Sequence, residues 1–174
     1  GRAHDWQTLF DAAIRLRDDG RIRFLIVGDG VGYRALRERV GAAGLNSFTF
    51  LPYQPLDRLA DAMAAANVHL VSLRPALEGL IVPSKFLGVL AAGRPVVFIG
   101  DAAGELAPVI RATDCGAVVS EGDDAALAAT LRAFADNSER VAACGARGHA
   151  LLRERYARSK AIGAWVDVIG GGFG

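Results

Sequence analysis

Cysteines and long hydrophobic runs are scarce in this chain, and each scarcity excludes a class of protein. The two cysteines, Cys115 and Cys144, lie in unrelated segments without the spacing of metal ligands. The longest apolar runs, at 67–73 and 95–99, are far shorter than the roughly 20 residues that a membrane-spanning helix needs. We therefore expect no metal site, no transmembrane segment, and two small buried thiols in a reducing cytosol.

An excess of charge of one sign is also missing. The formal net charge is +1, and arginines and acidic residues are interleaved along the chain, so there is no basic stripe. A nucleic acid is therefore not an expected partner. With 52% hydrophobic and 22% charged residues, the composition is that of a folded protein and not of a disordered one.

The N-terminus has neither a methionine nor a secretory leader, because an amphipathic pattern starts soon after Gly1. We expect the sequence to be a fragment of a cytoplasmic protein. Its 174 residues suit one domain, predicted to span 1–169, and the glycine-rich tail at 170–174 is expected to fray.

Short β-branched runs alternate with longer amphipathic segments between residues 22 and 119. This pattern predicts βαβ units, and so a Rossmann-like α/β fold with a doubly wound parallel sheet between helices. The predicted strands are 22–27, 48–51, 68–73, 96–99 and 117–119. The predicted helices are 5–17, 33–43, 55–66, 83–92, 105–112, 124–135, 138–154 and 159–169. Because such a sheet usually begins with a strand, we expect that a first strand has been lost before Gly1.

Ligands of open parallel sheets bind beyond the carboxyl ends of the strands, so the residues after each strand are the candidates for chemistry. Gly28 and Gly30 suit a tight turn that lets a phosphate or a sugar approach the backbone, and equally a turn with no ligand. Tyr33 stands where a dinucleotide fingerprint has glycine. Tyr53 and Gln54 lie in a loop stiffened by two prolines, whose backbone suits the edge of a nucleobase.

The most informative segment is 74–85, which follows the third strand and leads into a helix that Pro83 begins. The free amides and the dipole of a helix N-terminus both favour an anion. Lys85 lies in that first turn, where a cation opposes the dipole unless an anion accompanies it, and it is one of only two lysines. Lys85 is thus either a phosphate ligand or a solvated surface cation. Glu78 is either an acceptor for sugar hydroxyls or a simple loop acid.

Four motifs occur in order: F-L-I-V-G-D-G, F-L-P-Y-Q-P, A-A-A-N-V-H-L-V-S-L and L-E-G-L-I-V-P-S-K-F-L-G-V-L-A-A-G-R-P-V-V. Together they resemble the C-terminal domain of the retaining glycosyltransferases of the GT-B fold, family 4 (group 1), and most of all the bacterial O-antigen, capsule and exopolysaccharide enzymes. The resemblance implies transfer of a hexose or N-acetylhexosamine from a nucleoside-diphosphate sugar, UDP-linked, to a glycan or lipid-linked acceptor. A separate N-terminal domain would bind that acceptor, and the enzyme would be peripheral to the inner face of the membrane.

The same resemblance assigns residues to the donor. The diphosphate would be held by Gly79, Leu80, Ile81, Ser84 and Lys85. The base and ribose would lie near Tyr53 and Gln54, His4 matches a basic residue ahead of the first helix, and Glu78 would contact the donor sugar. No cofactor and no metal are implied, and the chain has no D-x-D pair. Gly88 is a departure, because the family usually has a second glutamate there for the ribose.

Two alternatives from other classes remain, both doubly wound. A non-catalytic phospho-receiver needs an exposed aspartate at the end of a central strand, and its only candidate, Asp29, is flanked by glycines. A nicotinamide-binding domain conflicts with Tyr33 and with the lack of an acidic residue at the end of the next strand.

Overall fold

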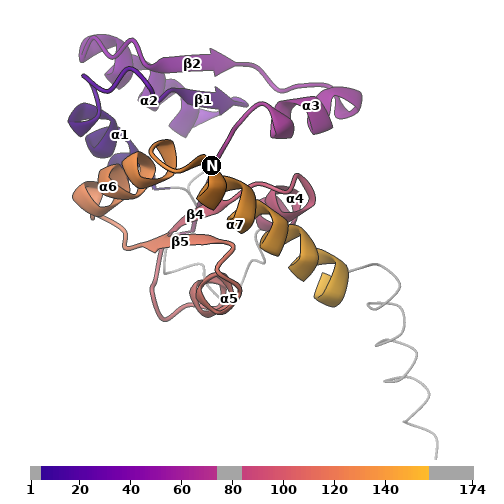
Figure 1. Ribbon diagram of the computed structural model, residues 1–174. Coiled ribbons are helices and arrows are strands. Elements are labelled where there is room, and N and C mark those ends of the chain that lie inside the picture. Colours follow the sequence, from indigo (N-terminus) through magenta and orange to yellow (C-terminus); the bar gives the residue numbers. More distant parts are fainter. Residues whose placement is uncertain (1–4, 74–83, 157–174) are drawn as a thin grey trace, which may run out of the picture.

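The computed structural model describes residues 5–73 and 84–156, in which helices and strands alternate (Figure 1). The strands are β1 (Phe24–Val27), β2 (Phe48–Leu51), β3 (His69–Ser72), β4 (Val96–Ile99) and β5 (Gly116–Val119). The helices are α1 (Trp6–Arg15), α2 (Val31–Ala42), α3 (Leu59–Ala64), α4 (Ser84–Ala91), α5 (Leu106–Thr113), α6 (Asp124–Ala135) and α7 (Ser138–Leu151). A 3-10 turn, η1 (Leu56–Arg58), precedes α3, and a π-helical segment, η3 (Leu152–Tyr156), follows α7.

The three strand pairs in the described residues are all parallel, which confirms the Rossmann-like α/β class. The strands form two separate sheets, however. One contains β1 and β2, and the other contains β3, β4 and β5 in that order. Figure 1 shows the β1–β2 pair set apart from β4 and β5, with α1 packed beside α6. Within the described residues, no hydrogen bonds between strands join these two sheets.

Burial and capping explain why these segments form these elements. All four residues of β4 are buried and apolar, because β4 is paired on both sides. Three helices begin at a residue whose side chain accepts a hydrogen bond from a backbone amide of the first turn, as good N-caps do. These caps are Asp5 for α1, Asp123 for α6 and Asn137 for α7.

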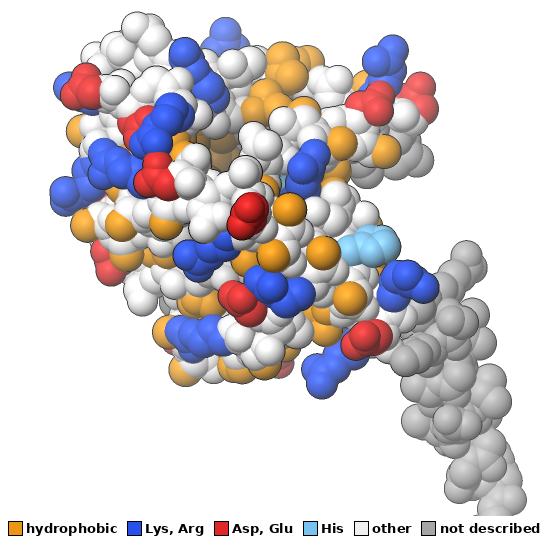
Figure 2. All heavy atoms as spheres, in the orientation of Figure 1, with side chains coloured by type: hydrophobic (Ala, Val, Ile, Leu, Met, Phe, Trp, Pro, Cys, Tyr) orange, Lys and Arg blue, Asp and Glu red, His pale blue; other side chains and the backbone are white. Residues whose placement is uncertain are grey.

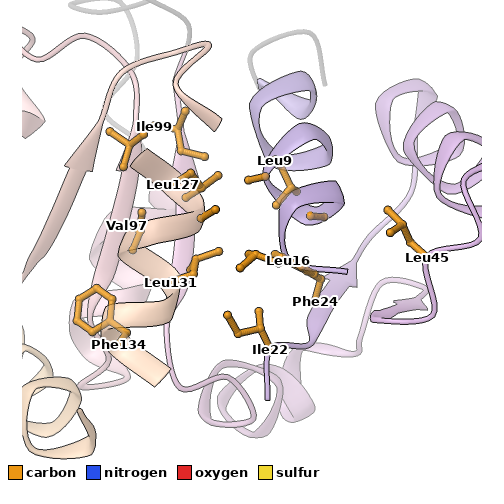
Figure 3. Close-up of a cluster of buried hydrophobic side chains, with 14 of the residues drawn as sticks. Leu9, Leu16, Ile22, Phe24, Leu45, Val97, Ile99, Leu127, Leu131 and Phe134 are labelled. Carbon is orange, nitrogen blue, oxygen red and sulfur yellow. The ribbon is translucent and has the colours of Figure 1, made fainter. Parts of the chain in front are cut away.

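Hydrophobic side chains from α1, α6 and both sheets form one core cluster. Leu9 of α1 and Leu16, the residue that follows α1, point toward Leu127 and Leu131 of α6, and Phe24 of β1 lies below them (Figure 3). Each of these five side chains is less than 10% exposed. The cluster therefore connects the two sheets, which no hydrogen-bonded ladder joins in the part of the chain that the structure describes.

A second core cluster lies around α4, α5 and α7, where α7 contributes Leu151 at its end and two glycines along its contact with α4. Gly145 faces the turn after α4, and a Cβ there would overlap the carbonyl oxygen of Gly93 and lie 2.8 Å from its carbonyl carbon. A Cβ on Gly148 would lie 3.0 Å from Cδ2 of Leu90. The small residues let α7 pack almost directly on the backbone near α4.

Both cysteines are completely buried, as the sequence predicts. Burial raises the pKa of the Cys115 thiol. The Nη2 of Arg147 donates a hydrogen bond to Sγ of Cys144 at 3.3 Å and binds the Asp114 carboxylate at 2.7 Å. Arg147 thus links α7 to the residue that precedes Cys115.

Several predicted boundaries need correction. The predicted helix 55–66 is a 3-10 turn followed by the short α3, because the Arg58 amide bonds the Pro55 carbonyl in a tighter turn. Helix α2 begins at Val31, two residues early, since Gly30 (φ 119°) already forms its N-cap. The predicted helix 138–154 leaves α geometry at Leu151. The predicted helix 159–169 and the tail 170–174 lie outside the described residues. Among the helices that the structure describes, none is long and apolar enough to cross a membrane.

Candidate functional site

The carboxyl ends of β1 and β3 lie beside the N-terminus of α1. The Asp5 amide donates a hydrogen bond to Oγ of Ser72, the last residue of β3, at 3.3 Å. The indole of Trp6 packs so closely on Gly32, in the first turn of α2, that a Cβ there would overlap it. Because α2 directly follows the loop after β1, both strands end at one edge of the molecule. This is the edge at which ligands of such folds bind.

The loop after β1 has a backbone that only glycine adopts readily. Gly28 and Gly30 have φ values of 138° and 119°. The Tyr53 ring lies against Gly28, since a Cβ there would be 3.4 Å from its Cε1, and Tyr53 is 73% exposed. The structure thus brings together two predicted site residues from different loops, Gly28 and Tyr53. The neighbouring Gln54 donates through Nε2 to the Pro52 carbonyl at 2.9 Å, so its amide group orders its own loop.

Asp29, the aspartate that a phospho-receiver would use, is already engaged. Its Oδ1 accepts hydrogen bonds from the Gly30 amide at 2.6 Å and from Nη1 of Arg34 at 2.9 Å. The side chain forms an exposed ion pair at the start of α2. This arrangement argues against a receiver aspartate.

The N-terminus of α1 carries its own anion, which sequence reasoning did not assign to the site. The Asp5 carboxylate is 5% exposed and accepts hydrogen bonds from the amides of Gln7 and Thr8 and from the Thr8 hydroxyl. The Thr8 oxygen in turn accepts a hydrogen bond from the Gly122 amide at 2.7 Å. The amides that would attract an external anion are therefore occupied. Asp5, directly before the amphipathic helix pattern, is the N-cap signal that marks this network in the sequence.

Helix α4 places a cation in its first turn. Its buried residues Phe86, Val89 and Leu90 fix the helix against the core. Lys85 is exposed by surface area, yet the surrounding protein displaces enough water to lower the pKa of its ammonium group. An anion bound beside Lys85 would reverse that shift, because it stabilises the charged form. The structure thus places Lys85, a predicted site residue, in the first turn of α4.

The remaining predicted site residues are not all described. His4, Glu78, Gly79, Leu80 and Ile81 lie outside the described residues. Ser84 begins α4, but only its backbone is described. Gly88 lies one turn after Lys85, and a Cβ there would meet only Cε of Met63, at an ordinary 3.5 Å. Packing therefore does not require glycine at position 88.

Other features of the described residues add no second site. No group of His, Cys, Asp or Glu side chains in 5–73 and 84–156 could hold a metal ion. A hollow of about 350 Å³ is lined by residues that precede β1 and β2, including Ile22, Arg23, Asn46 and Ser47. It lies at the amino ends of these strands, away from the site. On the face shown in Figure 2, basic and acidic side chains are interspersed without a basic patch.

The parallel strands, the glycine loop and the helix starts at one edge define a Rossmann-like α/β domain, in which the candidate site lies at the carboxyl ends of the strands. The chain belongs to the family described as Glycosyl transferases group 1, whose model matches residues 2–137. This membership agrees with the resemblance of its motifs and argues against the receiver and nicotinamide alternatives.

One curated relative is similar to this chain in sequence, and two solved structures are similar to it in fold. A protein of Escherichia coli strain K12 named as a colanic acid biosynthesis glycosyl transferase, WcaI, is 33% identical over 106 residues, which are 61% of this chain and 26% of WcaI. The crystal structure of Anabaena HepE in complex with UDP-glucose has a TM-score of 0.80 at 17% identity, covering 98% of this chain and 46% of HepE. The C-terminal domain of the group 1 protein LpcC from Francisella tularensis has a TM-score of 0.72 at 17% identity, covering 90% of this chain and 81% of that domain.

The chain matches only part of the length of these longer relatives. The chain spans about a quarter of WcaI and less than half of HepE. The fold is that of GT-B glycosyltransferase structures, and it corresponds closely in extent to the C-terminal domain of LpcC.

Proposed function

We propose that this chain is the nucleotide-sugar-binding domain of a retaining, family 4 glycosyltransferase of the bacterial O-antigen, capsule or exopolysaccharide type. The donor is a UDP-linked hexose or N-acetylhexosamine, and the acceptor is a glycan or a lipid-linked glycan bound by an N-terminal domain. The whole enzyme is cytoplasmic and peripheral to the membrane. Family membership and the UDP-glucose in the HepE structure support this proposal.

The observation that carries the proposal is the position of Lys85 in the first turn of α4, with a pKa lowered by loss of water. The helix dipole and the ammonium group both favour a diphosphate there. The start of α1 does not compete, because the Asp5 carboxylate occupies its amides. The loop of Glu78, Gly79, Leu80 and Ile81 leads into α4, and its amides are proposed to complete the site.

The base would bind at the neighbouring loops. The exposed Tyr53 ring beside Gly28 offers an aromatic surface next to an open backbone turn. Aromatic side chains and nucleobases stack favourably. Gln54 orders this loop, and Gly88 leaves space where a ribose-binding carboxylate is usual in the family.

The chemistry that we propose is electrostatic. As the sugar departs, negative charge grows on the diphosphate, and Lys85 with the oriented amides of the helix start stabilises that charge. No metal or cofactor takes part in this proposal, and Glu78 contacts the donor sugar. The acceptor and any catalytic base belong to another domain, so this chain alone should bind a donor without transferring its sugar.

Calorimetric titration with UDP tests the proposal. A helix end contributes about 0.3 to 1 kcal/mol to an exposed anion and roughly 2 when partly buried, and a charge-assisted hydrogen bond adds about 1.5 to 3. Lys85→Ala should therefore weaken UDP binding about tenfold to a hundredfold. Arg23→Ala is the matched control, because it removes an exposed cation at the amino end of β1.

The same titration at different pH values, and with a chelator, tests the role of Lys85 and the independence of metal. Affinity should fall as the pH rises through the lowered pKa of Lys85, since the neutral amine no longer attracts phosphate. A chelator should leave binding unchanged. Equal UDP affinity for Lys85→Ala and the wild type, with both chains folded, would refute the site. Loss of binding with chelator would refute its independence of metal.

A further inference from the structure

Helix α3 is attached to the rest of the domain by few apolar contacts. Of its side chains that the structure describes, none is buried, and only Met63 packs against a core cluster. Figure 1 shows α3 at the end of the link from β2, away from α1 and α6. Helices of globular proteins are usually fixed by a buried apolar face. A different kind of contact must therefore fix α3 in place.

Two side chains from other elements bind the carbonyl groups at the end of α3. Nε2 of His69, the first residue of β3, lies 2.8 Å from the Met63 carbonyl oxygen. Nη2 of Arg94 donates a hydrogen bond to the Ala64 carbonyl oxygen at 2.8 Å. The last carbonyls of a helix have no partner within the helix, and the helix dipole favours donors and cations there. The two side chains thus cap α3 at its C-terminus.

His69 and Arg94 form one unit, which we call the α3 clasp. The His69 amide donates to the carbonyl of Pro95, the residue after Arg94, at 3.0 Å. Because the Met63 carbonyl can only accept, Nε2 of His69 carries the proton in this bond. Burial lowers the pKa of the His69 ring, so the ring is neutral at neutral pH and does not repel the Arg94 guanidinium.

The α3 clasp fixes one end of the segment that carries Tyr53. At the other end of this segment, the Gly28 amide donates to the Leu51 carbonyl at 3.0 Å. After Tyr53, the Arg58 amide donates to the Pro55 carbonyl at 2.9 Å in the turn that leads directly into α3. The position of the exposed Tyr53 ring therefore depends on where α3 lies.

Helix α3 also contacts the helix of Lys85. A Cβ on Gly88 would lie 3.5 Å from Cε of Met63, so α3 contacts α4 about one turn after Lys85. The clasp residues themselves lie at the amino ends of β3 and β4, away from the carboxyl edge. His69 and Arg94 can thus act on a ligand at that edge only through α3.

We propose that His69 and Arg94 are positioning residues for the nucleotide, because they fix α3 and thereby keep the Tyr53 ring beside Gly28. This inference rests on the proposed function of the site. If α3 leaves its docked position in a fraction of the molecules, only the docked fraction binds the base, and the observed affinity falls by that factor. The phosphate site at Lys85 does not need the clasp, because the buried face of α4 fixes that helix in the core.

Calorimetry with two probes, UDP and inorganic pyrophosphate, tests this division of the site. Arg94→Met keeps the apolar stem but removes the donors to the Ala64 carbonyl. It should weaken UDP binding about three- to tenfold and leave pyrophosphate binding unchanged. Arg17→Met is the matched control, because Arg17 donates to the Ala43 carbonyl at the end of α2, at 3.3 Å. The control removes the same charge and a similar bond, and should bind both probes as the wild type does.

Variants of His69 separate the hydrogen bond from the shape of the side chain. His69→Leu removes the donor and should weaken UDP binding about three- to tenfold, whereas His69→Gln keeps an N–H donor and should bind UDP normally. Amide exchange reports the clasp without any ligand. The Ala65 amide, which donates to the Asp61 carbonyl within α3, should exchange about fivefold faster in His69→Leu, with the Val97 amide of the core strand β4 unchanged.

The outcomes distinguish failure of the clasp from failure of the site. A wild type that binds UDP, with Arg94→Met and His69→Leu binding it equally well, overturns the inference alone. An equal loss of UDP and pyrophosphate binding in these variants also overturns it, because the effect is then not confined to the base. A wild type that binds neither probe refutes the proposed function, and with it the role of the clasp.

Discussion

Gly145 makes the packing of α7 against α4 sensitive to a single methyl group. In Gly145→Ala the new Cβ would overlap the carbonyl oxygen of Gly93 and approach its carbonyl carbon to 2.8 Å. The obstacle is backbone, which cannot rotate away as the tip of a side chain can. Helix α7 or the turn after α4 must therefore move.

Two opposing terms decide the size of the effect. Alanine favours a helix interior over glycine by about 1 kcal/mol. Overpacking typically costs about 1 to 3 kcal/mol, and an immovable backbone neighbour suggests the upper end. The net destabilisation should be about 2 kcal/mol, which lowers the Tm of a chain of this size by about 4 to 8 °C.

The matched control is Gly41→Ala in α2. Gly41 is exposed, has no positive φ, and a Cβ there would meet nothing within 4 Å. This variant should be about 1 kcal/mol more stable than the wild type, because only the helix preference changes. Urea and thermal unfolding followed by circular dichroism measure both. If Gly145→Ala is as stable as the wild type or more so, the close approach of α7 is wrong.

Three further predictions test the site edge and the surface. Thr8→Val removes the hydroxyl that accepts a hydrogen bond from the Gly122 amide, so the free energy of unfolding in urea should fall by about 1 to 3 kcal/mol. An unchanged unfolding midpoint would contradict this hydrogen-bond network. Tyr53→Ala should weaken UDP binding roughly tenfold in calorimetry whereas Tyr53→Phe binds normally, and equal losses would exclude ring stacking. The hydrogen bond from the Arg21 guanidinium lowers the pKa of Asp19 to about 2, so the stability that this pair provides is lost only as the pH falls toward 2. Arg21→Ala should therefore raise the Asp19 pKa in an NMR titration.

Local patterns predicted the elements well. The apolar run of β4 lies where the sequence places it, because burial on both faces is visible as an uninterrupted hydrophobic run. The strand at Phe48–Leu51 also lies where the sequence places it, although its residues alternate between half-buried and exposed. The ends of the helices were predicted less accurately. The start of α2 depends on the φ of Gly30, which composition alone does not reveal.

Long-range pairing was not predictable. The split into two sheets depends on which strand edges meet, and period-2 or apolar patterns do not encode that choice. The bond between Gly122 and Thr8 joins residues 114 positions apart. Motifs predicted Tyr53 and Gly28 as site residues, and the structure places these two side by side. The motifs could not show that the Asp5 carboxylate already accepts hydrogen bonds from the amides at the start of α1.

The burial of both thiols makes the native chain a ready background for chemical labelling. Cys115 and Cys144 are the only cysteines in the sequence, and neither exposes any surface. A maleimide dye should therefore react with the native protein only when the core opens, and the reaction rate would report that opening. A single cysteine introduced at the exposed Ala102, just after β4, would carry one dye at the carboxyl edge of the sheet. The same molecule then becomes a fluorescent sensor for whatever binds there.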